Sequence, residues 1–204
     1  MRVVIIGLSI LTLSACGAAG SETGTRDAVG PCGNIQPILN ARSEGEPFGS
    51  LQGANKMMGD TPLPDTFIGT HKAFGAACTA SVMDGFGAGS TIYTYSCPLF
   101  EGNSMGRDAE QADAEAAFDT AASEMRACLG EAWETAEDTE NGDYQVYHKF
   151  TYKPVAMADS ASGFTVDPAF LEMSYTPFMR GRGGPSGWQV VLQFQAQIDA
   201  PAEE

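Results

Sequence analysis

The chain has 204 residues, of which 43% are hydrophobic, and its 26 acidic and 11 Lys or Arg residues give a formal net charge of −15. This hydrophobic content is sufficient for a packed core, so the composition excludes a wholly disordered chain. The acidic balance argues against a nucleic-acid-binding protein, because phosphate recognition requires clustered cations. The length predicts one folded domain.

The first fifteen residues have the pattern of a secretion signal. Arg2 precedes an apolar run over residues 3–13 that is interrupted only by small residues. This run is shorter than the roughly 20 apolar residues that a membrane-spanning helix needs, and it suits the apolar region of a signal peptide. The sequence LSACG follows directly at residues 13–17.

The residues Leu13, Ser14, Ala15 and Cys16 resemble the lipobox of bacterial lipoproteins, in which an aliphatic residue and two small residues precede a cysteine. The resemblance covers residues 1–17 and no part of the mature domain. It implies cleavage between Ala15 and Cys16, and a diacylglyceryl group on the Cys16 thiol, whose thiolate is nucleophilic. The alternative is an ordinary signal peptide that is cut beside a free cysteine.

The resemblance also implies an envelope location, with the lipid bilayer as a partner through acylated Cys16. Each buried methylene of an acyl chain contributes about 0.8 kcal/mol, so two or three chains anchor a protein. Gly17 stands where Gram-negative lipoproteins of the inner membrane tend to have Asp, so an outer-membrane location is expected if the host is Gram-negative. Residues 16–31 are expected to form the lipidated cysteine and a flexible tether. A single domain over residues 32–199 and a polar tail at 200–204 would follow.

Four further cysteines lie in the predicted domain: Cys32, Cys78, Cys97 and Cys128. In an exported chain an even number predicts disulfides, and four cysteines allow three pairings that the sequence alone does not distinguish. A hairpin turn at Gly87-Ala88 makes paired residue numbers sum to 175, which places Cys78 opposite Cys97. This register favours a Cys78–Cys97 bond and leaves Cys32 for Cys128. A metal site is the competing interpretation, but the chain has no C-x-x-C motif and no nearby His.

Residue spacing predicts the elements of the first half of the domain. A short helix is expected within residues 33–44, and a loop over the Gly- and Pro-rich residues 45–69. Strands are expected over residues 72–83 and 90–98. The strongest helix covers residues 107–129, because apolar and alanine residues recur there on one stripe and a glycine follows as a stop.

The second half is predicted to be rich in strands. Trp133 opens a short candidate strand, and alternating side chains predict strands over residues 144–152, 169–177 and 188–198. The last strand places glutamines on one face, which is expected to be the wet face of the sheet. The element order predicts an α+β fold, in which an antiparallel sheet of five to six strands packs on the long helix 107–129 and a short N-terminal helix, stapled by disulfides.

The sequence offers few candidates for chemistry, since it contains no hydrolase, P-loop or dinucleotide-binding motif. Arg180 and Arg182 are interpreted as part of an exposed hairpin loop, with contact to lipid phosphate or an acidic partner as the alternative. His148 is expected on the apolar face of its strand as a hydrogen-bonded residue, and a general base acting with Tyr152 or a helix carboxylate is the alternative. The acidic residues 134–143 lack the spacing of a calcium loop and are interpreted as a solvated loop.

These patterns favour a cell-envelope lipoprotein, anchored at Cys16, whose domain is a non-catalytic binding or structural module. Its expected partner is an envelope protein or a small ligand, and no cofactor or metal is expected. One alternative is a secreted hydrolase-like enzyme that uses His148 with carboxylates. Another is an inhibitor or immunity-type lipoprotein that inserts a hairpin such as residues 180–187 into a target cleft.

Overall fold

The computed structural model describes six stretches of the chain: residues 32–86, 89–102, 106–142, 145–157, 165–177 and 187–200. The predictions for the signal peptide, for Cys16 and Gly17, and for the turn at Gly87-Ala88 lie outside these stretches. The same holds for Arg180 and Arg182.

The described residues form two α-helices, two single 3-10 turns and eight strands. The helical elements are α1 (Gln36–Ala41), η1 (Gly49–Leu51), α2 (Gln111–Leu129) and η2 (Gly130–Ala132). The strands are β1 (Gln52–Met58), β2 (Thr61–Gly69), β3 (Thr79–Phe86), β4 (Ser90–Glu101), β5 (Trp133–Asn141), β6 (Val146–Pro154), β7 (Ala169–Thr176) and β8 (Gly187–Ile198).

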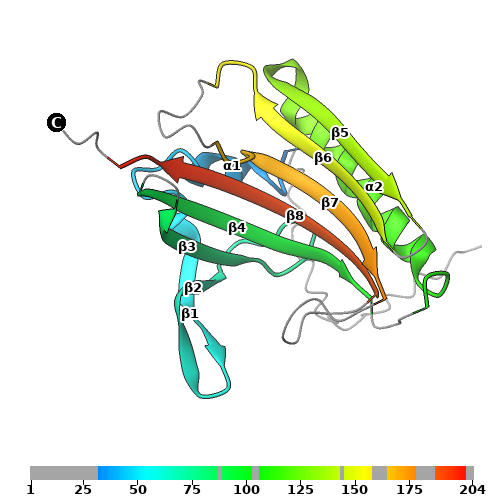
Figure 1. Cartoon of the computed structure of the whole chain (residues 1–204). Coiled ribbons are helices and arrows are strands. Elements are labelled where there is room, and N and C mark those ends of the chain that lie inside the picture. The colour runs from blue at the N-terminus through cyan, green and yellow to red at the C-terminus, as the bar shows by residue number, and fades with distance from the viewer. Residues whose placement is uncertain are drawn as a thin grey trace, which may run out of the picture.

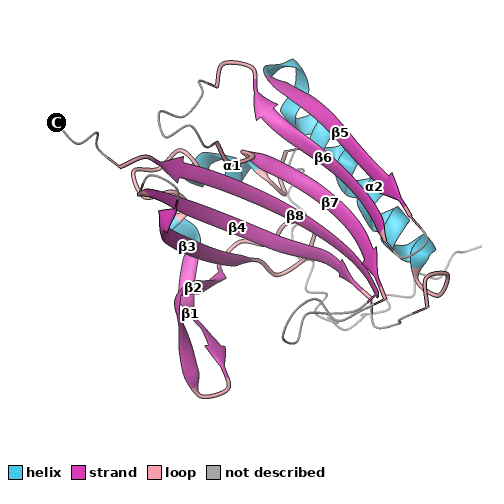
Figure 2. Cartoon of the chain, in the orientation of Figure 1, coloured by secondary structure: helices cyan, strands magenta, loops and turns pink. Residues whose placement is uncertain are grey.

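All eight strands belong to one sheet in the order β1-β2-β3-β4-β8-β7-β6-β5, and every neighbouring pair is antiparallel. The sheet is curved, and α2 lies along one of its faces (Figure 1). Figure 2 shows both helices on the same side of the strand layer. The predicted α+β class and the antiparallel sheet are therefore confirmed.

The core lies between α2 and the face of the sheet that it covers, which we call the inner face. From β8 this face receives Trp188, Val190, Leu192 and Phe194, all fully buried. From α2 it meets Phe118, Met125 and three buried alanines, whose small side chains let the helix approach the sheet closely. Full burial of each large apolar side chain stabilises the fold by about 1.5–3 kcal/mol. The glutamines of β8 lie half-exposed on the opposite, outer face, as the alternation predicts.

Two disulfides join Cys32 to Cys128 and Cys78 to Cys97, which confirms the pairing that the hairpin register favours. Thr79 pairs with Ser96 and Ala80 with Tyr95, so the paired numbers sum to 175 as predicted. The bonds close loops with sequence separations of 96 and 19 residues. The chain-entropy model assigns to such loops about 4.7 and about 3 kcal/mol. Two disulfides indicate an oxidising, extracytoplasmic location.

The predicted count of five to six strands is wrong, since the sheet has eight. The predicted loop over residues 45–69 contains η1 and the strands β1 and β2. Nearly every residue of these two strands is exposed or half-exposed, so neither face needs apolar side chains. The alternation by which a half-buried strand is recognised is therefore absent from this segment.

The candidate strand that opens at Trp133 is confirmed, and it runs through the acidic stretch interpreted from its sequence as a solvated loop. It forms β5, the outermost strand of the sheet, and eight of its nine residues are exposed. Across from it, Lys153 pairs with Glu134 and Lys149 with Asp138, so opposite charges face each other between the strands. Acidic side chains also protect an open sheet edge against pairing with other chains.

Two predicted element boundaries also differ from the structure. The long helix begins at Gln111 and not at residue 107, because the backbone before it turns to contact β8 and the β5–β6 hairpin. The strand predicted from residue 72 begins at Thr79, since residues 72–78 form a turn closed by an isolated bridge between Ala73 and Ala76.

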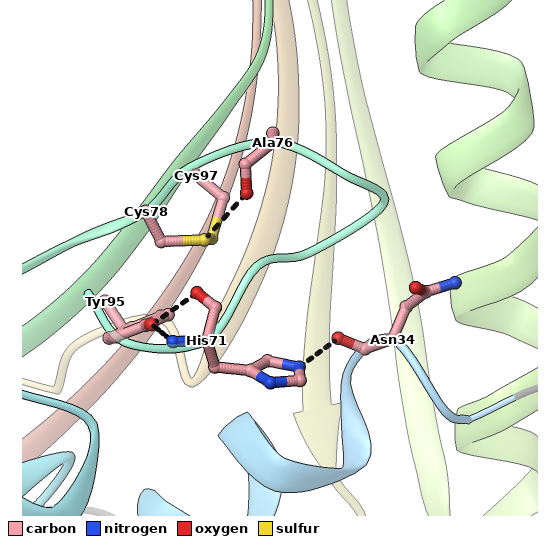
Figure 3. The surroundings of a disulfide bond; sticks show 6 residues. All are labelled: Asn34, His71, Ala76, Cys78, Tyr95 and Cys97. Atoms are coloured by element: carbon pink, nitrogen blue, oxygen red, sulfur yellow. Dashed lines mark hydrogen bonds between the residues drawn. A yellow bond between two sulfur atoms is a disulfide. The ribbon is translucent and has the colours of Figure 1, made fainter. Parts of the chain in front are cut away.

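Two fully buried tyrosines have opposite hydrogen-bond environments. The hydroxyl of Tyr95 donates to His71 O at 2.7 Å and accepts from His71 N–H at 3.1 Å (Figure 3). The hydroxyl of Tyr152 has no hydrogen-bond partner among the described residues. Burial raises the pKa of Tyr152 to about 12, an effect that the charge of Arg126 partly opposes. An unpaired buried hydroxyl is unfavourable, whereas a paired one stabilises its surroundings.

We therefore expect Tyr95→Phe and Tyr152→Phe to differ in their effect on stability. Tyr95→Phe leaves the His71 backbone groups without their partner and should cost about 1–3 kcal/mol. Tyr152→Phe removes an unpaired hydroxyl and should be neutral or stabilising by up to about 1 kcal/mol. Urea unfolding at neutral pH measures both values. Equal destabilisation by the two substitutions would contradict the hydrogen-bond assignment.

We expect the folded domain to lose stability in alkali. Burial disfavours the tyrosinate form, so the unfolded chain releases its tyrosine protons first. The contribution of Tyr152 is fully present below pH 10 and is lost as the pH rises through about 12. Urea midpoints should therefore fall above pH 10, and they should fall less in Tyr152→Phe. Tyr93, Tyr95 and Tyr147 contribute to the remaining loss, because burial also raises their pKa values.

Candidate functional site

The cavity that contains His148 is the strongest candidate site, because it combines titratable side chains with space. It has a volume of about 310 Å³ and lies between the start of α2 and the end of the β5–β6 hairpin. Its lining comprises Arg107, Gln111, Glu115, Thr139, Glu140, Asn141, Val146, Tyr147, His148, Met173 and Trp188. It is therefore a mixed cavity, with polar groups from four elements around an apolar floor.

The side chain of His148 lines this cavity because its position in β6 places it on the inner face of the sheet. There it lies opposite Met173 of β7. Its ring lies 4.5 Å from that of Phe118 and 4.9 Å from that of Phe150, centre to centre. Its Nε2 lies 2.8 Å from Oε1 of Glu137, on the neighbouring strand β5. The side chain of His148 is 26% exposed. The predicted hydrogen-bonded position on the apolar face is thus confirmed.

The partner of His148 differs from both partners considered in the sequence. Glu137 belongs to a strand, not to the helix, and the hydroxyl of Tyr152 is not hydrogen-bonded to His148. The helix carboxylate of Glu115 lines the same cavity without a hydrogen bond to the ring. No sequence pattern identified Glu137 as the partner of His148, because the contact depends on the pairing of β5 with β6.

Arg107 also lines the cavity, and no sequence pattern identified it as a candidate. Its guanidinium donates to Gly142 O at 3.2 Å and to Asn141 Oδ1 at 2.6 Å. Its own carbonyl accepts a hydrogen bond of 2.6 Å from the indole N–H of Trp188. These bonds fasten the segment before α2 to the β5–β6 hairpin and to β8.

Besides His148, the described lining of the cavity offers few side chains suited to covalent chemistry. The hydroxyl groups among the lining residues belong to Thr139 and Tyr147, and the described lining contains no Ser or Cys nucleophile. In the described part of the chain, no three His, Cys, Asp or Glu side chains are grouped to hold a metal ion. The lining places polar side chains around apolar ones, an arrangement that suits a small ligand with polar groups.

A second cavity of about 330 Å³ lies beside the middle of α2. It is lined by Phe74, Leu99, Ala116, Ala117, Thr120 and Ala121. This lining is almost entirely apolar, and no titratable group takes part in it. Its walls come from the small residues of the helix, which leave space where larger side chains would fill it.

The remaining candidate residues have structural roles or lie outside the description. All four domain cysteines are in disulfides, and Cys78 and Cys97 lie in the core. Arg180 and Arg182 lie outside the described residues. Among the helices of the described residues, none has both the length and the apolar character required to cross a bilayer.

Comparison with protein-family models finds no match to this chain. Comparisons with curated proteins and with solved structures also find no match.

We expect packing, not the ion pair, to hold His148 in place. Phe118 is buried and stacks on Phe150 at 5.3 Å, so Phe118→Ala should cost about 3–5 kcal/mol. Glu137 is 56% exposed, so Glu137→Gln should change the free energy of unfolding by less than about 1 kcal/mol. Urea unfolding at pH 7 measures both. A loss in Glu137→Gln as large as that in Phe118→Ala would show that the ion pair dominates.

Proposed function

We propose that the protein is a cell-envelope lipoprotein, anchored by lipid at Cys16, whose domain is a non-catalytic binding or structural module. In a Gram-negative host, Gly17 favours the outer membrane. The expected partners are the bilayer itself and an envelope protein or small ligand that contacts the domain.

The pairing of the cysteines carries this proposal. The sequence has five cysteines, and the four in the domain are joined by two disulfides. Cys16 is left without a partner in this set, and it is the cysteine that follows the apolar signal and the lipobox-like residues. An unpaired cysteine at that position in an exported chain is the acceptor that lipidation requires.

The state of His148 supports a non-catalytic role. Its ring packs against those of Phe118 and Phe150, and its Nε2 is hydrogen-bonded to Glu137. A histidine that activates a protein nucleophile needs a hydroxyl or thiol within hydrogen-bond reach, and the described lining of its cavity offers only Thr139 and Tyr147 as hydroxyl groups. Binding of a partner is the role that this arrangement favours.

The anchor predicts that Cys16→Ala abolishes acylation. The intact mass of native protein should correspond to a chain that begins at residue 16 and carries acyl groups, and the variant should lack them. Recovery in carbonate-washed membranes should fall by at least about tenfold, since the acyl chains supply most of the membrane affinity. If the variant stays in the membrane because its signal peptide is not cleaved, its intact mass will include residues 1–15.

The double variant Arg180→Ala, Arg182→Ala is the matched control. It should keep the acyl mass and the membrane recovery if these arginines belong to an exposed loop. Native protein with an unmodified Cys16 would contradict the proposed anchor.

A further inference from the structure

The hairpin formed by β1 and β2, residues 52–69, stands apart from the rest of the fold, and we call it the arm. Only three residues of β2, Thr66, Phe67 and Ile68, pair with β3. Beyond Thr66 the arm pairs only with itself, and Figure 1 shows it projecting away from the sheet. Its outer part therefore contributes little to the core, although a free hairpin of this kind is only marginally stable by itself.

The tip of the arm exposes large apolar side chains. Met57 is 52% exposed and Met58 is 67% exposed. Consecutive strand residues point to opposite faces, so the arm presents a methionine on each side. Flexible methionine side chains suit contact with an irregular apolar partner.

The charges of the tip are balanced, in contrast to the rest of the chain. Residues 55–63 carry one cation, Lys56, and one anion, Asp60, whereas the whole chain has a net charge of −15. Anionic headgroups repel an acidic protein surface but not a neutral one. The tip is thus a part of the molecule that can approach a membrane surface without this repulsion.

The base of the arm adjoins the point where the domain begins. Thr70 N–H donates to Leu51 O at 2.9 Å, which closes the base. His71 follows directly, and its Nε2 lies 3.1 Å from Asn34 O (Figure 3). Asn34 is two residues after Cys32, where the tether predicted from the sequence ends. The tether and the arm therefore start from neighbouring places.

The tether and the arm also have similar reach. The tether predicted from the sequence would, as a flexible chain of 16 residues between Cys16 and Cys32, have a root-mean-square end-to-end distance of about 20–24 Å. The seven residues of β1 extend about 20–23 Å at roughly 3.3 Å per residue. A bilayer that holds the acyl chains of Cys16 is thus within reach of Met57 and Met58.

We infer that the arm is a second membrane contact, in which Met57 and Met58 insert into the headgroup–acyl boundary of the bilayer that holds Cys16. This inference rests on the proposed lipid anchor. A weak contact is sufficient, because a short tether gives the tip an effective concentration in the millimolar range near the surface. The contact limits how the domain can rotate on its tether, and it turns the sheet in a defined direction relative to the membrane.

Methionine oxidation tests the inference with the native, acylated chain bound to phosphatidylcholine vesicles. Met83 is the internal control, since it is 56% exposed and lies on β3 beyond the last residue that pairs with the arm. In the free domain, these exposures predict similar rates of oxidation by chloramine-T for the three methionines. Insertion of the tip should slow oxidation of Met57 and Met58 by about fivefold or more relative to Met83, because oxidation follows exposure. Peptide mass spectrometry measures the three rates.

A pair of tryptophan variants gives a second, independent measurement. On vesicles, the emission of Met58→Trp should be blue-shifted relative to that of the native chain. It should also be quenched on vesicles that contain brominated lipids relative to vesicles that contain none. Met83→Trp, the matched control, should show neither change.

The outcomes separate the contact from the anchor. Acylated, vesicle-bound protein with comparable oxidation rates at the three methionines, or with unquenched Met58→Trp, overturns the membrane contact alone. Protection of Met57 and Met58 in whole cells but not on vesicles also overturns it and assigns the arm to a protein partner. Native chain without acyl groups overturns the anchor and the contact together.

Discussion

The pairing of β4 with β8 is the interaction on which the rest of the fold depends. These two twelve-residue strands lie at the centre of the sheet and join the strands before α2 to those after it. Their register runs from Thr91 opposite Ile198 to Glu101 opposite Gln189. The helix α2 packs over this junction and contacts β4, β7 and β8. Without this long-range pairing, the two halves of the chain would form separate sheets with exposed apolar faces.

The two disulfides tie further segments to β4 and to α2. One joins Cys97 of β4 to the residue before β3, and the other joins the end of α2 to the residue where the described domain begins. Both bonds restrict the unfolded chain, and they also fix the position from which the N-terminal segment leaves the domain.

The two edges of the sheet are specialised in different ways. At one edge, β5 carries exposed acidic side chains, which protect its open backbone against pairing with other strands. At the other edge, β1 and β2 leave the sheet and carry Met57 and Met58 at the tip of the arm. The neutral, apolar tip and the acidic remainder are the features from which we infer a membrane contact at the arm.

The sequence by itself determined the features that depend on local pattern. Apolar alternation identified β6, β7 and β8, the alanine stripe identified α2, and the hairpin register predicted the Cys78–Cys97 bond. Only the tertiary structure decided that residues 52–58 and 61–69 are strands. It also decided that the strand opening at Trp133 continues through the acidic stretch. These strands are exposed on both sides, so burial imposes no alternation on them, and their hydrogen bonds come from neighbouring strands. Glu137 and Arg107 were not foreseen near His148, because the pairing of β5 with β6 positions Glu137 and long-range hydrogen bonds of the segment before α2 position Arg107.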